Sequence, residues 1–565
     1  MANVTADLAA EGFAATPRPH VRPARPRAGR GWTRAAAAIS MLALLPVVAL
    51  LWQALAGSSG LWPHLRAHVL PQALHDTAIL LVGVGVLVTA IGTSAAWLVT
   101  AYDFPGRRVF SWALLLPLAM PSYIIAYAYL DLLHPIGSLQ TGLRGVLGYD
   151  SPRDFRLPDI RSMAGCILLL SLVLYPYVYI PVRALFLSQA ANLIDASRTL
   201  GTSRAAVFRR VALPLARPAI AVGASLALME ALNDVGAAEF LGVRTLTVSI
   251  YSTWVTRSDL AGAAQIALAM LVMVLALILA ERWARRNVRY AGSAMRSIPL
   301  GPRRLTGLAG WTALGLVALP VALGFAAPAG YLVHAALSRL GAGPDLGALW
   351  RAGASTVALA AAATAATVGL GLVVAAAARL RPGRGAETAL RLSTIGYAMP
   401  GTVVALGLLM PVAAFDGLFD RGIASLTGTR PGMILLGSGA ALVLAYVVRF
   451  LSISAGTIEA GFTRLPRSYD GAARSLGRSP TGLMGQIHLP LLRAPLVAGA
   501  LLVFVDCVKE LPATLMLRPL GVETLATQLY AEASRGTYEN GALAALAILA
   551  VGLLPAILLA RTGER

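Results

Sequence analysis

Lysine and cysteine are almost absent from this chain. The single lysine, Lys509, stands between Val508 and Glu510. A Walker A phosphate-binding loop needs Gly-Lys-Ser or Gly-Lys-Thr, so the chain carries no such loop and cannot use ATP through one. The two cysteines, Cys166 and Cys507, both fall inside apolar segments. Their number and placement argue against a disulfide framework and against a Cys-x-x-Cys metal site.

Charged residues are also scarce. The 565 residues are 57% hydrophobic and 13% charged, whereas soluble domains are about 25% charged. Long apolar runs recur along the chain, and each can cross about 30 Å of hydrocarbon at about 1.5 Å per residue. We therefore predict an all-α polytopic membrane protein with about twelve spans. They lie near residues 35–55, 77–101, 111–133, 162–187, 217–238, 262–281, 308–337, 354–378, 392–414, 432–455, 495–517 and 541–560.

The formal net charge of +21 reflects arginines beside the apolar spans. No basic domain interleaved with aromatic residues is present, so the charge indicates positive-inside topology and no nucleic-acid partner. With the tail of residues 1–34 inside, the Arg-rich connections all fall on the cytoplasmic side. We expect a multi-pass protein of the bacterial inner membrane, in contact with lipid, with both termini in the cytoplasm.

The second half of the sequence repeats the first. Thr77 matches Thr356, and the Pro-Gly-Arg run at 105–107 matches the run at 382–384. Six spans per half return the chain to its starting side, so the halves are expected to be parallel repeats. We predict a first lobe at 35–281 (core 73–281), a linker at 282–306 and a second lobe at 307–561 (core 353–560).

Each half also contains a basic insert, at 190–217 and at 465–493, between its fourth and fifth spans. A short helical piece leads to a Gly and then, about a dozen residues later, to Leu-Pro. Gly201, Leu213 and Pro214 match Gly477, Leu489 and Pro490, all 276 positions apart. An ordinary interfacial loop that contacts lipid phosphates explains one copy, but two copies with the same spacing favour a pair of docking segments.

Ionisable residues recur at membrane depth, where each costs about 2.5 kcal/mol or more. Spacings of three and four place such residues on one helix face. We predict that they line a gate or path for a polar solute; an ion pair that locks the halves together is the structural alternative. The predicted path residues are Glu230, Asn233, Asp234, Glu239, Asp506, Lys509, Glu510, Pro512 and Thr514. No catalytic constellation and no metal-ligand spacing is found.

The paired inserts resemble the "EAA" signature of type I ABC importer permeases. In that family the insert is a coupling helix that docks on the ATPase subunit. The residues at the motif positions are Asp195, Ala196, Gly201, Leu213 and Pro214, then Gly471, Ala472, Ala473, Gly477, Leu489 and Pro490. The second copy departs from the pattern, because Gly471 stands where an acidic residue is expected and Asp470 comes one place early.

The run KELPATLMLRP at 509–519 resembles the ferric-iron permeases of this importer family. The resemblance implies Fe(III) delivered by a periplasmic binding protein and a separate homodimeric ATPase that uses ATP and Mg. It implies no cofactor bound by this chain and no enzyme activity of its own. Alternatives in the same class are thiamine, polyamine, sulfate or another anion as cargo. Outside the class are a secondary transporter and a membrane anchor or sensor.

Overall fold

The computed structural model describes residues 30–57, 60–187, 203–285, 302–341, 343 and 345–562. Residues 1–29 of the predicted tail and 286–301 of the predicted linker lie outside this part. The described chain is helical almost throughout and contains one short parallel sheet. In it β1 (Tyr102–Asp103) pairs with β2 (Arg303–Arg304). The predicted all-α polytopic fold is confirmed.

Eight helices in the described residues are long and apolar enough to cross a membrane, and three bent pairs raise the number to 11. The twelfth expected span coincides with α28 (Ala542–Thr562). The long helices are α1 (Arg30–Ala56), α3 (Leu70–Ala101), α11 (Leu213–Asn233), α14 (Leu260–Arg285), α15 (Leu308–Val321) with α16 (Ala327–Gly341), α17 (Leu346–Leu380), α19 (Gly401–Thr427) and α21 (Ala440–Thr463). The bent spans contain α4 (Arg107–Ala113) with α5 (Ser122–Leu132), α7 (Met163–Leu174) with α8 (Pro176–Leu187), and α23 (Pro480–Leu483) and α24 (Leu489–Leu491) with α25 (Arg493–Val508).

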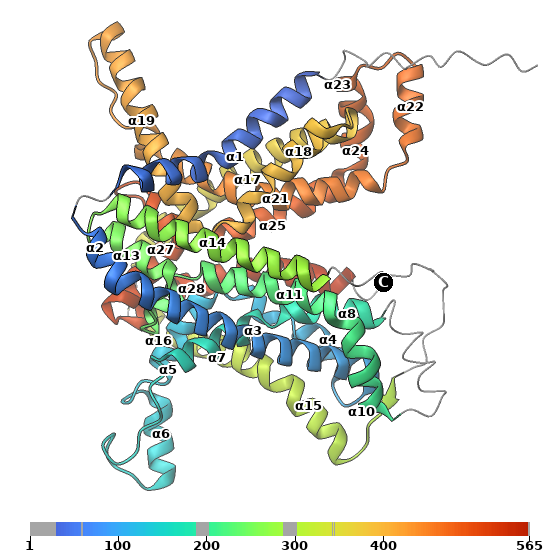
Figure 1. Ribbon diagram of the computed structural model, residues 1–565. Coiled ribbons are helices and arrows are strands. Elements are labelled where there is room, and N and C mark those ends of the chain that lie inside the picture. The colour runs from blue at the N-terminus through green and yellow to red at the C-terminus, as the bar shows by residue number, and fades with distance from the viewer. Residues whose placement is uncertain are drawn as a thin grey trace, which may run out of the picture.

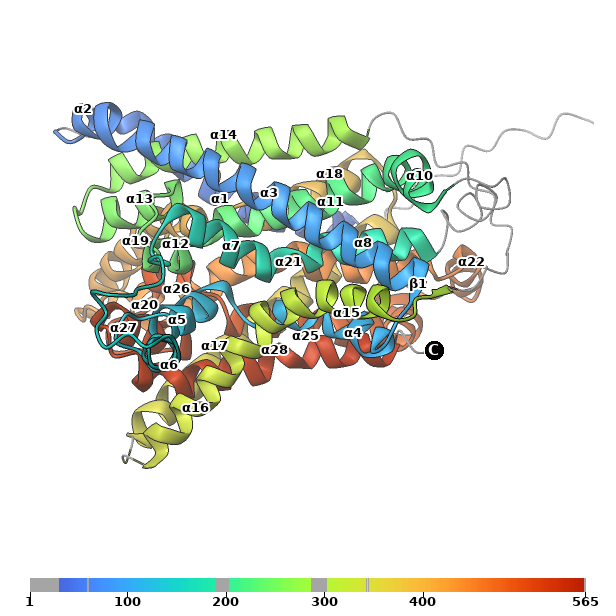
Figure 2. The same cartoon turned by 90° about the horizontal axis from the view of Figure 1, so that it is seen from below.

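Shorter helices cap the two ends of this bundle. At one end α10 (Arg204–Val207) and α22 (Arg467–Ser475) lie on the same side as the end of α28 (Figures 1 and 2). At the other end lie α2 (Trp62–His64), α13 (Leu246–Val255) and α27 (Leu525–Arg535). The remaining short helices are α6 (Ser138–Leu147), α12 (Gly236–Phe240), α18 (Arg384–Ser393), α20 (Ile434–Ser438) and α26 (Pro512–Leu517).

The first helix of each half packs on the other half. The helix α1 contacts α17, α18 and α19 of the second half as well as α14 of its own half. In return α15 contacts α3 and α4, and α16 contacts α5 as well as α28. The two halves are therefore held together by exchanged helices in addition to their central contact.

Matching threonines hold matching helices in the two halves. The hydroxyl of Thr77 accepts a hydrogen bond from the amide of Leu246 at 2.9 Å, and Thr356 does the same for Leu525 at 2.9 Å. The separation is 169 residues in both cases. Each hydroxyl satisfies an amide in the first turn of a helix, α13 or α27, that has no partner within the helix. The sequence repeat is thus a structural repeat.

Four helices widen to a π-turn immediately before a proline. The turns are Leu65–Val69, Phe208–Ala212, Ala322–Ala326 and Met484–His488, and Pro71, Pro214, Pro328 and Pro490 each follow two residues after a turn. Proline has no amide proton for the carbonyl one turn earlier, and its ring crowds that carbonyl. A wider turn accommodates the ring without ending the helix. Two of these turns lie in the predicted docking segments.

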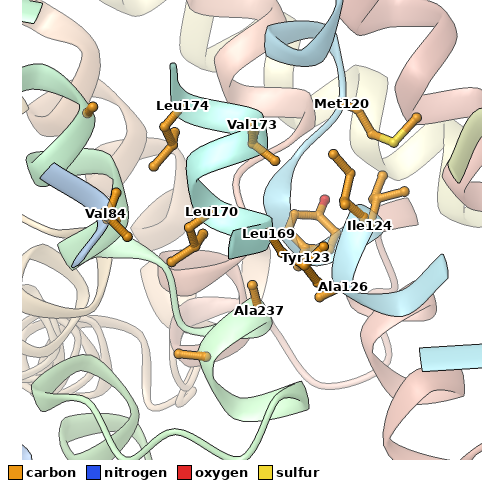
Figure 3. Close-up of a cluster of buried hydrophobic side chains, with 14 of the residues drawn as sticks. Val84, Met120, Tyr123, Ile124, Ala126, Leu169, Leu170, Val173, Leu174 and Ala237 are labelled. Atoms are coloured by element: carbon orange, nitrogen blue, oxygen red, sulfur yellow. The ribbon is translucent and has the colours of Figure 1, made fainter. Parts of the chain in front are cut away.

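The core of the first half forms where α5, α7 and α12 meet. Tyr123 of α5 lies beside Leu169 of α7 and close to Ala237 of α12, whereas Leu170 and Ile124 lie on the outer sides of this contact (Figure 3). All five side chains are buried. This packing fixes the ends of the helices that border the central cavity.

Candidate translocation cavity and coupling segments

A cavity of ≈ 120 Å³ lies between the two halves, at the end of α11 and the end of α25. Seven of the nine predicted path residues line it: Glu230, Asn233, Asp234, Asp506, Lys509, Glu510 and Pro512. The other two lie just outside it. Glu239 accepts a hydrogen bond from the Tyr530 hydroxyl at 2.7 Å, and Thr514 bonds the Tyr446 hydroxyl at 2.6 Å.

Both spans that carry the charged residues are broken at the cavity. The helix α11 ends at Asn233 and α12 begins at Gly236, while α25 ends at Val508 and α26 begins at Pro512. The expectation that 217–238 and 495–517 are continuous spans is therefore wrong, although the residues of both clusters do face one cavity, as their spacing indicates. Helix ends expose unpaired backbone groups, and a broken helix at membrane depth is tolerated where it borders protein or a cavity.

Asp234 and Glu510 close these breaks. Asp234 accepts a hydrogen bond from the amide of Ala237 at 2.7 Å, and it also accepts one from the hydroxyl of Ser122. Glu510 accepts from the amides of Ala513 at 3.0 Å and Thr514 at 3.1 Å. A carboxylate at the start of a helix accepts hydrogen bonds from the free amides and interacts favourably with the positive end of the helix dipole. The two matched acids thus have a structural role as helix caps.

Two ion pairs neutralise the second-half acids. The guanidinium of Arg449, on α21, lies 2.6 Å from Glu510, and their side chains are 10% and 2% exposed. Lys509 lies 2.8 Å from Asp506, one turn earlier on the same chain segment. Sequence reasoning missed Arg449, although an arginine inside the apolar run 440–463 was the available signal.

Glu230 has a different environment. Its carboxylate accepts a hydrogen bond from the Tyr397 hydroxyl at 3.1 Å, and it forms no ion pair with any residue that the structure describes. Tyr177 lines the same cavity. Sequence reasoning missed both tyrosines, which no motif distinguishes from ordinary core residues. In total four carboxylates and two cationic side chains line the cavity, so its formal charge is negative.

The amide of Asn233 ties the halves together at the cavity. Its side-chain oxygen accepts a hydrogen bond from the backbone amide of Gly401 at 2.7 Å. Gly401 begins α19, whose first-half counterpart is the start of α5. Pro400 before it matches Pro121, which lines the cavity.

The second docking segment is described completely. Here Gly477, with φ +75°, follows the end of α22. The amides of Gly477 and Arg478 donate hydrogen bonds to the carbonyls of Arg474 at 3.0 Å and Ala473 at 3.0 Å. This is a Schellman motif, which needs a left-handed residue at that position. Gly471 and Ala472 are exposed on α22, and Leu489 and Pro490 form the start of α24.

A buried trio of side chains holds this segment against its lobe. Asp470 accepts a hydrogen bond from Arg379, at the end of α17, at 2.8 Å, and its other oxygen lies 2.9 Å from Nε2 of His488. Burial would raise the pKa of Asp470, but the bonds from Arg379 and His488 outweigh it and lower the pKa below its usual value. The acid that stands one place early in the motif therefore faces inward, and Gly471 takes the exposed position.

In the first docking segment Asp195, Ala196 and Gly201 lie outside the described residues. The described part runs from Ser203 through α10 to Leu213 and Pro214, which start α11. Among the described residues, no cluster of three or more His, Cys, Asp or Glu side chains is placed to hold a metal ion.

Comparison with protein families gives two matches in the chain. Residues 88–290 and residues 367–563 each match the binding-protein-dependent transport system inner membrane component. Together they cover more than half of the chain, and each match contains one docking segment and one half of the cavity.

Three relatives show the range of similar proteins. The chain is 23% identical to the Fe(3+)-transport system permease protein FbpB 2 of Haemophilus influenzae, over 86% of this chain and 89% of that protein. It is 28% identical to the molybdenum transport system permease protein ModB of Escherichia coli, over 35% of this chain and 86% of that protein. It is 30% identical to the sulfate transport system permease protein CysW of Escherichia coli, over 37% of this chain and 70% of that protein.

Proposed function

This chain belongs to the family of binding-protein-dependent transport system inner membrane components, and on that premise we propose that its cargo is Fe(III). The chain is the permease component of a binding-protein-dependent ABC transporter and a multi-pass inner membrane protein. It contains the permease domain twice, so one chain supplies both halves of the pathway.

The negative formal charge of the cavity is the main observation in favour of Fe(III) as the cargo. Among the lining side chains Arg449 and Lys509 are paired with acids, whereas Glu230 has only the Tyr397 hydroxyl. A site with excess carboxylate attracts a cation and repels an oxyanion such as molybdate or sulfate. Carboxylate oxygens are hard ligands that suit a hard, highly charged ion. The length of the similarity to the Fe(3+)-transport relative supports the same cargo.

The partners follow from the family. A periplasmic binding protein would deliver the cargo at the end with α13 and α27, and a homodimeric ATPase would use ATP and Mg at the end with α10 and α22. In this proposal both termini would be in the cytoplasm, in keeping with the Arg-rich connections. The chain itself would bind no cofactor.

The mechanism requires the two docking segments to move as a pair. Closure of the ATPase dimer would draw the segment around residues 195–212 towards α22, and the lobes would rock about their central contact. The cavity would then open to the docked binding protein, and hydrolysis would reverse the motion. Because Asp470 ties α22 to α17, movement of that segment is transmitted directly to a membrane helix.

Uptake by cells that depend on this chain tests the cargo. We expect radioactive Fe(III) to enter, and Glu230→Gln to lower its uptake about tenfold or more, the loss of one charge-assisted interaction. The matched control is Glu387→Gln, an exposed acid on α18 that does not line the cavity. Chain-dependent uptake of molybdate or sulfate without uptake of iron would overturn the proposal while leaving the permease assignment intact.

A further inference from the structure

A second, larger cavity lies beside the docking segment of the second half. It measures ≈ 930 Å³, is open on one side, and is bordered by the end of α17, the turn into α18, the start of α1 and the side of α22 that carries Asp470. Its lining includes five arginines, which are Arg379, Arg381, Arg384, Arg467 and Arg474, and one acid, Asp470. We call it the basic cavity. The Fe(III) assignment does not use it.

The positive charge of the basic cavity is largely uncompensated. Asp470 is already occupied by Arg379, at 2.8 Å, and by His488. None of the other four arginines forms an ion pair with a described residue. Glu387, one turn after Arg384 on α18, does not neutralise it. A concave surface lined by one sign of charge concentrates the opposite ion, so the cavity attracts anions.

The backbone adds a second feature that favours an anion. The helix α18 has ten residues and begins at Arg384, with Gly383 at its N-cap and no side-chain cap. Its first amides therefore lack partners within the helix and carry the positive end of the helix dipole. Free amides and arginines together form the arrangement that binds phosphate groups in proteins.

The first half places arginines at the matching turn. The run Pro-Gly-Arg at 105–107 corresponds to 382–384, and a small cavity of ≈ 110 Å³ there is lined by Arg107, Arg108 and Arg183. Residues 188–202, which follow Leu187 of its lining in the sequence, lie outside the described part. Arginines therefore gather at the matching turn of both halves.

We propose that the basic cavity binds a phosphate-bearing anion, either the headgroup of an acidic phospholipid or a soluble polyphosphate. The anion would bridge Arg467 and Arg474 on α22 to Arg381 and Arg384 at the α17–α18 turn. It would also screen the repulsion among these arginines. Because α22 is the proposed contact with the ATPase, the bound anion would stiffen the link between the ATPase and the membrane helices and so regulate coupling.

The test uses the full chain in phosphatidylcholine nanodiscs at constant ionic strength. Two probes are added separately: inorganic pyrophosphate in solution, and phosphatidylglycerol in the bilayer. The readout is the midpoint of thermal unfolding as a function of probe concentration. We expect at least one probe to raise it, and Arg384→Gln with Arg474→Gln to weaken the apparent affinity about tenfold or more. The control is Arg391→Gln, which lies on α18, is exposed and does not line the cavity.

The outcomes separate the sources and can refute the site. A response to pyrophosphate identifies a soluble ligand, and a response only to phosphatidylglycerol identifies a lipid headgroup; both support the basic cavity. An equal loss in the Arg391→Gln control would mean general surface charge and would overturn the proposal. The proposal would also be overturned if neither probe changed the unfolding midpoint. It would be overturned too if the double variant lost ATPase binding while its responses to the two anions stayed unchanged. If the double variant does not fold, the same measurements are made on the single variant Arg384→Gln.

Discussion

Arg449 gives the sharpest test of how the cavity is built. Replacement by methionine keeps the apolar stem but removes the guanidinium that lies 2.6 Å from Glu510. Because the Glu510 side chain is only 2% exposed, its charge would be left without compensation. Breaking a buried pair in this way costs about 3–5 kcal/mol. We expect Arg449→Met to lower the free energy of unfolding by that amount.

The assay is reversible unfolding of the purified chain in mixed micelles by increasing denaturing detergent. Glu510→Gln in the Arg449→Met background should restore much of the stability, because the neutral amide oxygen can still accept from Ala513. Lys509→Met is the comparison. It breaks a pair whose side chains are 30% and 24% exposed, so its cost should be smaller. If Arg449→Met were within about 0.5 kcal/mol of the parent, the reasoning would be refuted.

Three further predictions concern the docking segment and the repeat. Gly477→Ala should destabilise the turn by about 1–2 kcal/mol, because φ is +75° there. It should also weaken binding of the ATPase in a pull-down. The control Gly485→Ala should leave ATPase binding unchanged, because nothing lies within 4 Å of the added methyl group. Since the pKa of Asp470 is lowered, its stabilising effect is present above the unfolded pKa of about 3.9 and is lost as the pH falls through the folded value. The protection factors of the α22 amides, which are exchange rates corrected for the intrinsic pH dependence, should therefore be equal at about pH 7 and about pH 5 and lower at both in Asp470→Asn. Thr356→Val should lower the free energy of unfolding by about 1–3 kcal/mol because it leaves the Leu525 amide unpaired, and a thermal midpoint equal to the parent's would contradict this.

The repeat could be predicted because single residues with the same structural role stand at matching positions in the two halves. Thr77 and Thr356 were paired from spacing alone, and each satisfies an amide 169 residues later. The apolar runs also predicted the spans, because a helix of about 20 residues is what crosses a bilayer. The family was predicted from the docking segments and is confirmed by the two family matches.

The breaks at the cavity could not be predicted from hydropathy. The runs 217–238 and 495–517 read as continuous because the residues on both sides of each break are apolar. What ends the helices is tertiary: Asp234 and Glu510 turn back to cap the next helix, and Glu510 can do so because Arg449 lies beside it. A partner 61 residues away in the sequence leaves no local pattern.

The differences between the halves carry information that the repeat itself does not. Position 449 is an arginine where the first half has Val173, and both side chains line the same cavity. Asp470 and His488 stand where the first half has Ile194 and Ala212. Two identical halves would give a cavity and two docking segments with twofold symmetry. Among the described residues the cationic side chains that line the cavity, Arg449 and Lys509, both belong to the second half, so cargo in the cavity meets unequal walls. Because Asp470 links α22 to Arg379 of α17, we expect loss of this bond in Asp470→Asn to reduce the coupling of α22 to its membrane helix.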